Sequence, residues 1–300
     1  MRIAVAATGA LGLCALSCAK PHFPPVEASL APAEIYQRAI NHFAQADFFK
    51  PAESKTNEPA FALAPLILQE VNGTASPLSR PDCFGTLSLS NGLWVLDRSH
   101  PSVYWHADTV TLGGKAHARL AYWWCYPRET ARSESAPYLQ SSDQGDGSLA
   151  VQGVRLTLNS AGQPVIWEVL GDSSGTELVF VSQSLEAAAA GRFGKALPAR
   201  RYAIERSTQE APKVVVARVI DDGPVAMGPI VYLSAGTRRV STLICRCMPA
   251  QVKTLRTTAA YDLLPLPAIP SELRSRTPGF WPGDSPTDNR LEKWLRLPVF

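Results

Sequence analysis

The sequence predicts an α+β fold that is mainly antiparallel β: a sheet, sandwich or open barrel with an N-terminal helix and a short C-terminal helix. Short β-rich runs separated by turn residues fill the region from Cys83 to Met248. Helical spacing of apolar residues occurs mainly near the two ends of the chain. Strands joined by tight turns are antiparallel neighbours, and helices are expected at the edge of their sheet.

The first helix is expected from about Ala33 to Phe48, with Pro32 at its start. Its apolar residues at helical spacing are Ile35, Ala39, Ile40, Phe43 and Ala44. Residues 60–71 are apolar but are interrupted by Pro65, and they predict a short buried strand or a broken helix.

Turn residues between apolar alternations predict three hairpins. Their turns lie at Asn91-Gly92, at Gly113-Gly114 and from Asn159 to Gly162. Later strands are expected in "TELVFVSQSL", "RRYAIER", "VVVARVI" and "PIVYLSAGTRRVSTLICRC".

Two further helices are predicted. One is a short helix at Ala187 to Ala190 that Gly191 ends. The other lies in "DNRLEKWLRL", where Leu291, Trp294 and Leu295 fall at helical spacing, and it is expected to dock on the sheet. The polar segment 128–148 predicts a long surface loop.

Composition predicts a globular protein without a nucleic-acid surface. Hydrophobic residues make up 46% and charged residues 18%, and the formal net charge is only +3 with the basic residues scattered. The expected organisation is an export signal at 1–18, a tether at 19–31, a globular domain at 32–262 and a Pro-rich tail at 263–300.

The N-terminus has the pattern of an export signal. In "MRIAVAATGALGLCALSCAK" one cation, Arg2, precedes an uncharged and mostly apolar run that ends at Ala19. This run is shorter than the ~20 residues that a membrane-spanning helix needs, and small residues lie near its end. We therefore expect the segment to be removed.

The end of this run, "ALSC", resembles the lipobox of bacterial lipoproteins. The resemblance implies that Cys18 carries the lipid and becomes the new N-terminus, with Ser17 just before the cut. The sequence departs from the favoured pattern in having Ala15 where Leu is commonest, and Cys14 lies just upstream. Ordinary cleavage after Ala19 is the alternative. Acylated Cys18 would tether the protein to a bilayer in the bacterial envelope, facing the periplasm or the cell exterior.

Four cysteines remain in the mature chain: Cys83, Cys125, Cys245 and Cys247. An even number in an exported protein predicts two disulfides. Residues two apart on a strand lie about 6.6 Å apart, too far for a relaxed bridge, so Cys245 and Cys247 are expected to pair with Cys83 and Cys125. The alternatives are four buried free thiols, or a copper or zinc site at Cys245 and Cys247.

A catalytic alternative uses His106, Asp108 and His117, which flank the predicted turn at Gly113-Gly114. Asp108 could orient His117 for general-base catalysis, although an ordinary cross-strand ion pair is commoner. No G-x-S-x-G motif supplies a nucleophile.

Two other groups of residues allow either a structural or a functional interpretation. Asp221 and Asp222 could bind a cation, but Asp-Asp-Gly-Pro is also a good turn sequence whose carboxylates accept hydrogen bonds from loop amides. The aromatic run "AYWWCY" could form a binding face, but core packing is the commoner role.

These observations predict an exported, membrane-anchored lipoprotein that acts as a binding or structural module of the cell envelope. An envelope enzyme and a copper- or zinc-handling protein are the alternatives. No cofactor is indicated, and the partner or ligand is not specified by the sequence.

Overall fold

The computed structural model describes the following residues: 43–53, 58–71, 83–90, 93–127, 138–139, 149–171, 177–193, 214–235, 238–244, 252–269, 271, 291, 295 and 297–300.

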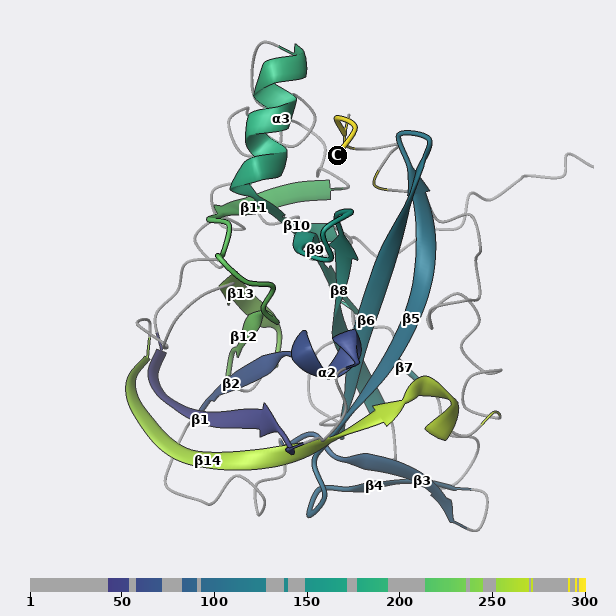
Figure 1. Ribbon diagram of the computed structural model, residues 1–300. Helices are drawn as coiled ribbons and strands as arrows, with labels where there is room; N and C mark the ends of the chain where they lie inside the picture. Colours follow the sequence, from purple (N-terminus) through teal and green to yellow (C-terminus); the bar gives the residue numbers. More distant parts are fainter. Residues whose placement is uncertain are drawn as a thin grey trace, which may run out of the picture.

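A curled sheet of twelve strands dominates the described part of the chain (Figure 1). In spatial order its main path is β11 (Val214–Ile220), β10 (Glu177–Ser182), β9 (Pro164–Leu170), β8 (Leu149–Leu158), β6 (Lys115–Pro127), β5 (Ser102–Leu112), β14 (Val252–Pro265), β1 (Phe43–Pro51), β2 (Leu66–Glu70), β12 (Ile230–Leu233) and β13 (Val240–Ile244). The short strand β7 (Tyr138–Leu139) pairs with β8 off this path. A separate two-stranded sheet contains β3 (Thr86–Ser90) and β4 (Leu93–Asp97).

The β-rich sheet or open-barrel fold predicted from the sequence is confirmed in its coarse form, but the sheet is mixed. Parallel pairing joins β1 to β14, β10 to β11, β12 to β2 and β14 to β5. The strand β14 was not predicted. Its first part pairs with β1 and its last four residues pair with β5, so it joins the two halves of the sheet. These parallel pairings connect segments far apart along the chain, which no turn dipeptide signals.

The prediction of a helix that reaches Phe48 is wrong, because Phe43–Pro51 forms β1. This strand has a neighbour on each side, β14 and β2, and both Ala46 and Phe49 are completely buried. Apolar residues three and four apart also suit a strand buried on both faces, so their spacing was ambiguous. Residues 33–42 of the expected helix lie outside the described residues.

The three predicted hairpins are present, as β3–β4, β5–β6 and β8–β9. In the second hairpin Leu112 pairs with Lys115, and the two turn residues Gly113 and Gly114 have φ values of 57° and 80°. Such positive φ values are the reason that this turn needs glycine. The segment 60–71 divides at Pro65 into helix α2 (Pro59–Ala62) and strand β2.

The predicted helix near Ala187 is α3 (Gln183–Phe193), which continues two residues beyond Gly191. A 3₁₀ turn, η2 (Leu266–Ala268), follows β14. Because β14 extends to Pro265, sheet structure continues past the expected domain boundary at residue 262. Near the C-terminus, Leu291 and Leu295 are buried in a cluster with residues of β5, β9 and β10.

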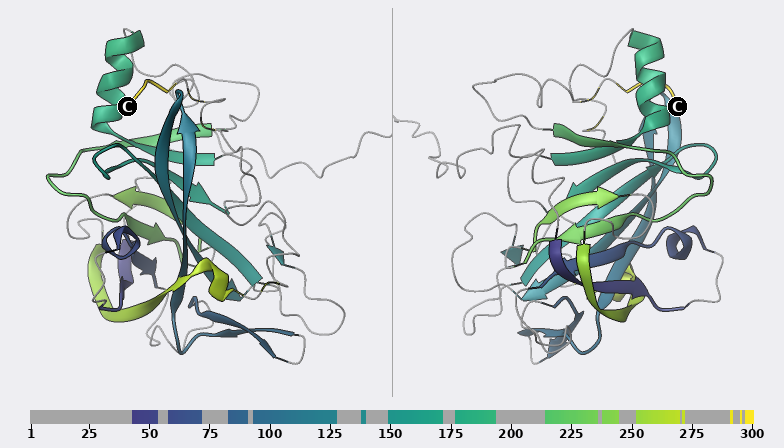
Figure 2. Two further views of the ribbon diagram at one scale, coloured as in Figure 1. Left: turned by 45° about the vertical axis from the view of Figure 1, so that its right-hand side comes forward. Right: turned by 90° about the vertical axis from the view of Figure 1, so that its left-hand side faces the viewer.

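Figure 2 shows the curl of the sheet from two further sides. The largest hydrophobic cluster among the described residues takes its members from strands along the whole main path of this sheet. This cluster includes Ala217 of β11 and Leu243 of β13, so residues from both edge strands pack into the same core. Gly153 permits close packing within the sheet, because a Cβ at this position would collide with the backbone oxygen of Tyr122 and the ring of Trp123.

Candidate functional site

The hairpin β5–β6 places Asp108 opposite Arg119 and not opposite His117. Arg119 donates to Asp108 from Nε and Nη2 at 2.8 and 2.6 Å, which makes a two-pronged ion pair. The carboxylate that was expected to orient a histidine is therefore held by a guanidinium. A cross-strand ion pair is present, but its cation is Arg119 and not His117.

His117 lies opposite Val110 and is buried. Its Nδ1 lies 3.1 Å from the carbonyl oxygen of Leu158, which can only accept, so Nδ1 donates this hydrogen bond. The ring also packs against the ring of Phe300 with a centroid distance of 4.3 Å. His106 lies opposite Ala121. Asp108 is thus engaged by Arg119 and His117 Nδ1 by Leu158, and the imidazole of His117 contributes to packing.

A second ion pair lies deeper, between Arg155 of β8 and Glu168 of β9, which face each other across the strands. Arg155 Nε donates to Glu168 Oε2 at 2.7 Å, and Nη2 contacts the other carboxylate oxygen. Burial acts to raise the pKa of Glu168, but the Arg155 guanidinium outweighs it and holds that pKa below its ordinary value. Glu168 is therefore ionised at neutral pH and does not have the raised pKa of a buried general acid.

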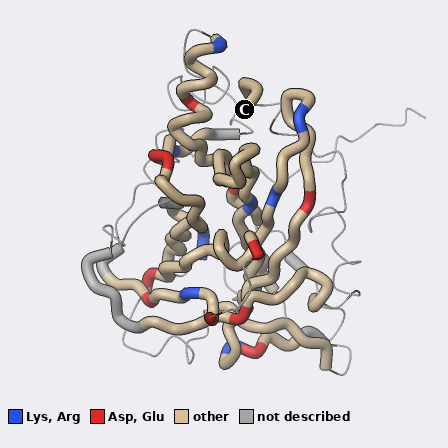
Figure 3. The backbone as a smooth tube through the Cα atoms, viewed as in Figure 1, with Lys and Arg blue, Asp and Glu red and all other residues tan. Residues whose placement is uncertain are grey.

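Acidic and basic residues are scattered along the described backbone (Figure 3). In the ion pairs Arg119–Asp108 and Arg155–Glu168, each positive charge is neutralised by its partner carboxylate. Within the described ranges the view shows no concentration of basic residues of the kind that binds a nucleic-acid backbone.

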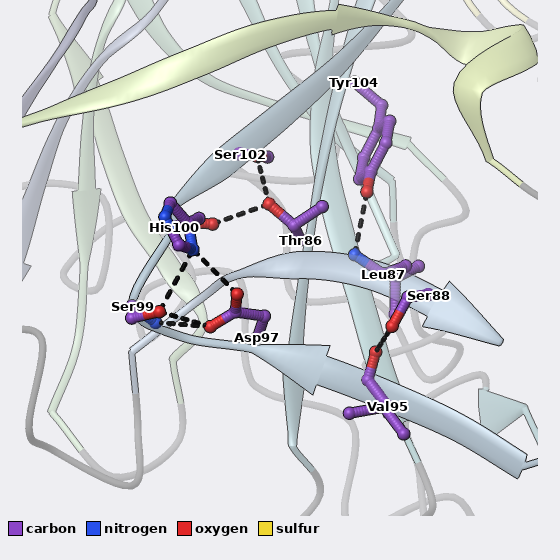
Figure 4. A network of polar contacts seen from close by, with 9 residues as sticks. All are labelled: Thr86, Leu87, Ser88, Val95, Asp97, Ser99, His100, Ser102 and Tyr104. Carbon is purple, nitrogen blue, oxygen red and sulfur yellow. Dashed lines mark hydrogen bonds and ion pairs between the residues drawn. The ribbon is translucent and has the colours of Figure 1, made fainter. Parts of the chain in front are cut away.

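A network of hydroxyl, imidazole and carboxylate groups occupies the turn after β4 (Figure 4). The backbone N–H and the hydroxyl of Ser99 donate to Asp97 Oδ1, and His100 Nδ1 lies 2.7 Å from Asp97 Oδ2. These contacts, from Ser99 and then from His100, lower the pKa of Asp97 to about 2. This network was not predicted from the sequence, although "DRSH" contains all three side chains.

This network has the residue types of a serine hydrolase but not the geometry. In an activated serine, the hydroxyl proton goes to one imidazole nitrogen while the carboxylate holds the other nitrogen. Here Ser99 and Asp97 both contact the same nitrogen, Nδ1, and the hydroxyl donates to the carboxylate itself. The group stabilises an exposed turn.

Neighbouring contacts tie the β3–β4 hairpin to β5 (Figure 4). Thr86 Oγ1 donates to the carbonyl oxygen of His100 at 2.7 Å and lies 2.6 Å from Ser102 Oγ. The backbone N–H of Leu87 donates to Tyr104 Oη at 2.8 Å. Burial raises the pKa of Tyr104 to about 12, so the phenol remains protonated. These hydrogen bonds hold the small sheet against the large one.

Cys83 and Cys125 are both buried, and no disulfide joins them to each other. They belong to different hydrophobic clusters: Cys83 to the large central one, and Cys125 to one that also contains Tyr104 and Trp123. Burial raises the pKa of the Cys125 thiol well above its usual range, so this sulfur stays protonated and does not readily supply a thiolate.

The other cysteines, Cys14, Cys18, Cys245 and Cys247, lie outside the described residues. Among the residues that are described, no group of three or more His, Cys, Asp and Glu side chains is arranged to hold a metal ion.

The aromatic run after Leu120 forms part of the core. Tyr122 and Trp124 are buried in the central cluster, while Trp123 lies on the opposite face in the second cluster with Cys125. Their alternation across the sheet follows the strand period, as the sequence analysis expected for a core role.

Asp221 and Asp222 have different environments, although both follow β11. Asp222 accepts hydrogen bonds from the backbone N–H and the hydroxyl of Ser184, at 2.7 and 2.8 Å, and so caps the first turn of α3. The carboxylate of Asp221 is exposed, and no hydrogen bond or ion pair is recorded for it within the described part of the chain. Both residues line a small pocket with Trp167, Gln163 and Met227.

No protein-family model, curated protein or solved structure matches this chain. Fold and site together define a curled, mixed β-sheet protein in which two ion pairs, Arg119–Asp108 and Arg155–Glu168, join neighbouring strands. In the part of the chain that the structure describes, no helix is both long and apolar enough to span a bilayer.

Proposed function

We propose that this protein is an exported, lipid-anchored component of the bacterial envelope that acts as a binding or structural module. The observation that carries the proposal is the N-terminal sequence, in which an apolar run after Arg2 ends in "ALSC". A lipidated Cys18 would anchor the chain, since each buried methylene contributes about 0.8 kcal/mol to membrane binding.

The environment of the candidate catalytic residues favours a non-enzymatic role. Arg119 occupies the carboxylate of Asp108, and the imidazole of His117 is buried between Leu158 and Phe300. A general base must be able to reach the proton that it removes. These residues instead connect neighbouring strands and support a rigid scaffold.

Substitution of Cys18 tests the anchor. The full-length protein, expressed in bacterial cells, should enter the membrane fraction, and mass spectrometry should find an acylated N-terminal cysteine. Cys18→Ala should leave the membrane fraction, because the acceptor of the lipid is gone. Cys14→Ala is the matched control and should stay anchored. Equal retention of Cys18→Ala would contradict the lipoprotein assignment.

We also propose that the four mature cysteines form two disulfides. Cys83 lies in the same cluster as Leu243, which is two residues before Cys245, whereas the cluster of Cys125 contains no residue of β13. This arrangement favours a bridge from Cys83 to Cys245 or Cys247, with Cys125 taking the other cysteine.

Thiol titration tests this pairing. The exported protein, denatured without reductant, should show almost no free thiol, and proteolytic mapping should recover a peptide that links Cys83 to the segment of Cys245. The same protein after reduction supplies the control with all thiols reactive. Four reactive thiols in the unreduced sample would overturn the disulfide proposal, and bound copper or zinc would then favour metal handling.

A further inference from the structure

Strand β5 has a neighbour on its β14 side only over its first part. Residues 102–105 pair with the end of β14, which stops at Pro265 and is followed by the turn η2. Within the described part of the chain, no strand pairs with residues 106–112 on the side away from β6, and the end of the β5–β6 hairpin stands clear of β14 (Figure 1). Residues 106–112 therefore form an open edge, called the β5 edge below. Described residues bound it at both ends, whereas β11 and β13 each adjoin a segment outside the described residues.

The turn of the β5–β6 hairpin determines which backbone groups face outward at the β5 edge. In a two-residue hairpin the residues that flank the turn, here Leu112 and Lys115, form a hydrogen-bonded pair, and such pairs recur at every second residue. The residues between them direct their N–H and C=O groups away from β6. These outward-facing residues are Ala107, Thr109 and Thr111. All three are also exposed, so the edge presents its free backbone groups where another strand can reach them.

The β5 edge lacks the features that usually prevent strands from pairing at an edge. Proteins block such edges with proline, lysine, a β-bulge or a very short strand. The sequence "HADTVTL" of residues 106–112 contains no proline, glycine, lysine or arginine, and the pairing of β5 with β6 continues to Leu112 without a register shift. Its single carboxylate, that of Asp108, is engaged by Arg119. The edge is therefore regular, and its exposed alanine and threonine side chains are small enough to accept a further strand.

The β5 edge is complementary to a second copy of itself. Antiparallel pairing about a two-fold axis at Thr109 places Thr109 opposite itself and Ala107 opposite Thr111 on the exposed face. Threonine pairs across antiparallel strands are favourable. On the other face Val110 lies opposite Asp108 of the other copy. Because Arg119 already neutralises Asp108 within each chain, the two edges bring no unpaired like charges together.

We propose that the β5 edges of two copies pair in this antiparallel way and join the two large sheets into one continuous sheet. The outward N–H and C=O groups of each edge are satisfied by those of the other, as in other cases of strand addition. Each copy contributes a single strand, so the interface is small and the dimer is weak and dependent on concentration. The inference goes beyond the module proposed above and does not depend on the lipid anchor.

Sedimentation and hydrogen exchange of the mature chain from Ala19 test the inference. This chain is exported behind an unrelated signal peptide, so that its cysteines can oxidise and no lipid is attached. The wild type should change from monomer to dimer as its concentration rises into the submillimolar range. The amide hydrogens of Ala107, Thr109 and Thr111 should be protected from exchange in the concentrated sample and exchange rapidly after dilution.

Substitutions of Thr109 supply the decisive variants. Thr109→Pro removes the outward N–H at the two-fold axis but no hydrogen bond to β6, and it should weaken the dimer about 10-fold or more. Thr109→Val keeps the N–H and the β-propensity, and it is the matched control that should dimerise like the wild type. Thr109→Lys places two like charges opposite each other, so it should dimerise poorly at low salt and recover in part at high salt. This variant changes only an exposed side chain, so it still decides the question if the proline variant does not fold.

Three results would overturn the inference. The first is a chain that stays monomeric at the highest concentration. The second is a dimer that both Thr109→Pro and Thr109→Lys leave unchanged, which would place the interface elsewhere. The third is amide protection that dilution does not remove, which would show that another segment of the same chain covers the β5 edge. The sample carries no lipid, so none of these results affects the test of Cys18.

Discussion

Replacing Glu168 with alanine is expected to lower the free energy of unfolding by about 3–5 kcal/mol. The substitution leaves the guanidinium of Arg155, which is itself buried, without the carboxylate that it faces on β9. An unpaired buried charge is far more costly than the loss of an exposed ion pair. Denaturant unfolding of the soluble domain, with an unchanged m value, measures the effect.

The double variant Arg155→Met with Glu168→Leu controls for the charge. It removes both ionised groups, so its stability should recover most of the loss and can equal that of the wild type. A loss below about 1 kcal/mol in Glu168→Ala would contradict the claim that this pair is buried and fully engaged.

The same pair determines a part of the pH dependence. Because the folded state lowers the pKa of Glu168 below its ordinary 4.5, its contribution to stability is present above that pH and is lost as the pH falls further. The double variant should therefore lose less stability than the wild type on acidification.

Replacing Trp124 with alanine is expected to lower the free energy of unfolding by about 3–5 kcal/mol, which is the usual loss when a large aromatic side chain is removed from a core. Trp124 is completely buried in the central cluster, which contains residues from both edges of the curled sheet. The cavity would weaken packing between strands that are distant in sequence. Thermal and denaturant unfolding report the loss.

Trp105→Ala is the matched control, because it removes the same atoms from a partly buried position packed against that cluster. Its cost should be clearly smaller, since the transfer and cavity contributions both fall with exposure. Equal losses in the two variants would show that the central cluster is not the main source of stability.

The local features of the fold could be predicted because their signals lie within a few residues. Asn91-Gly92 and Gly113-Gly114 each predicted a hairpin, and each hairpin is present. A two-residue turn also determines register. Counting back from Gly113-Gly114 places Arg119 opposite Asp108, so the observed ion pair was available from the sequence although His117 was considered instead.

The first strand could not be assigned in this way. The segment from Phe43 carries apolar residues at a spacing that fits both a helix and a strand buried on both faces. What decides between them is the presence of β14 and β2 on its two sides. Tertiary pairing overrode the local preference, as commonly happens for short apolar segments.

Part of the lining of the small pocket that follows β11 could also be predicted from the sequence. The sequence predicted a turn at Asp221 and Asp222 in which the carboxylates accept hydrogen bonds from backbone amides. Asp222 does accept a hydrogen bond from the backbone N–H of Ser184. The sequence did not show that Trp167 would line the same pocket, because this residue is more than fifty positions away and reaches the site only through the order of the strands.

By itself the sequence determined the β-rich class and its hairpins, because a turn and its flanking alternation act over a few bonds. Only the tertiary structure decided the parallel position of β14 between β1 and β5, the pairing of Arg155 with Glu168 and the capping of α3 by Asp222. These features depend on contacts between distant segments, whose free energy is gained only when the whole sheet has closed around its core.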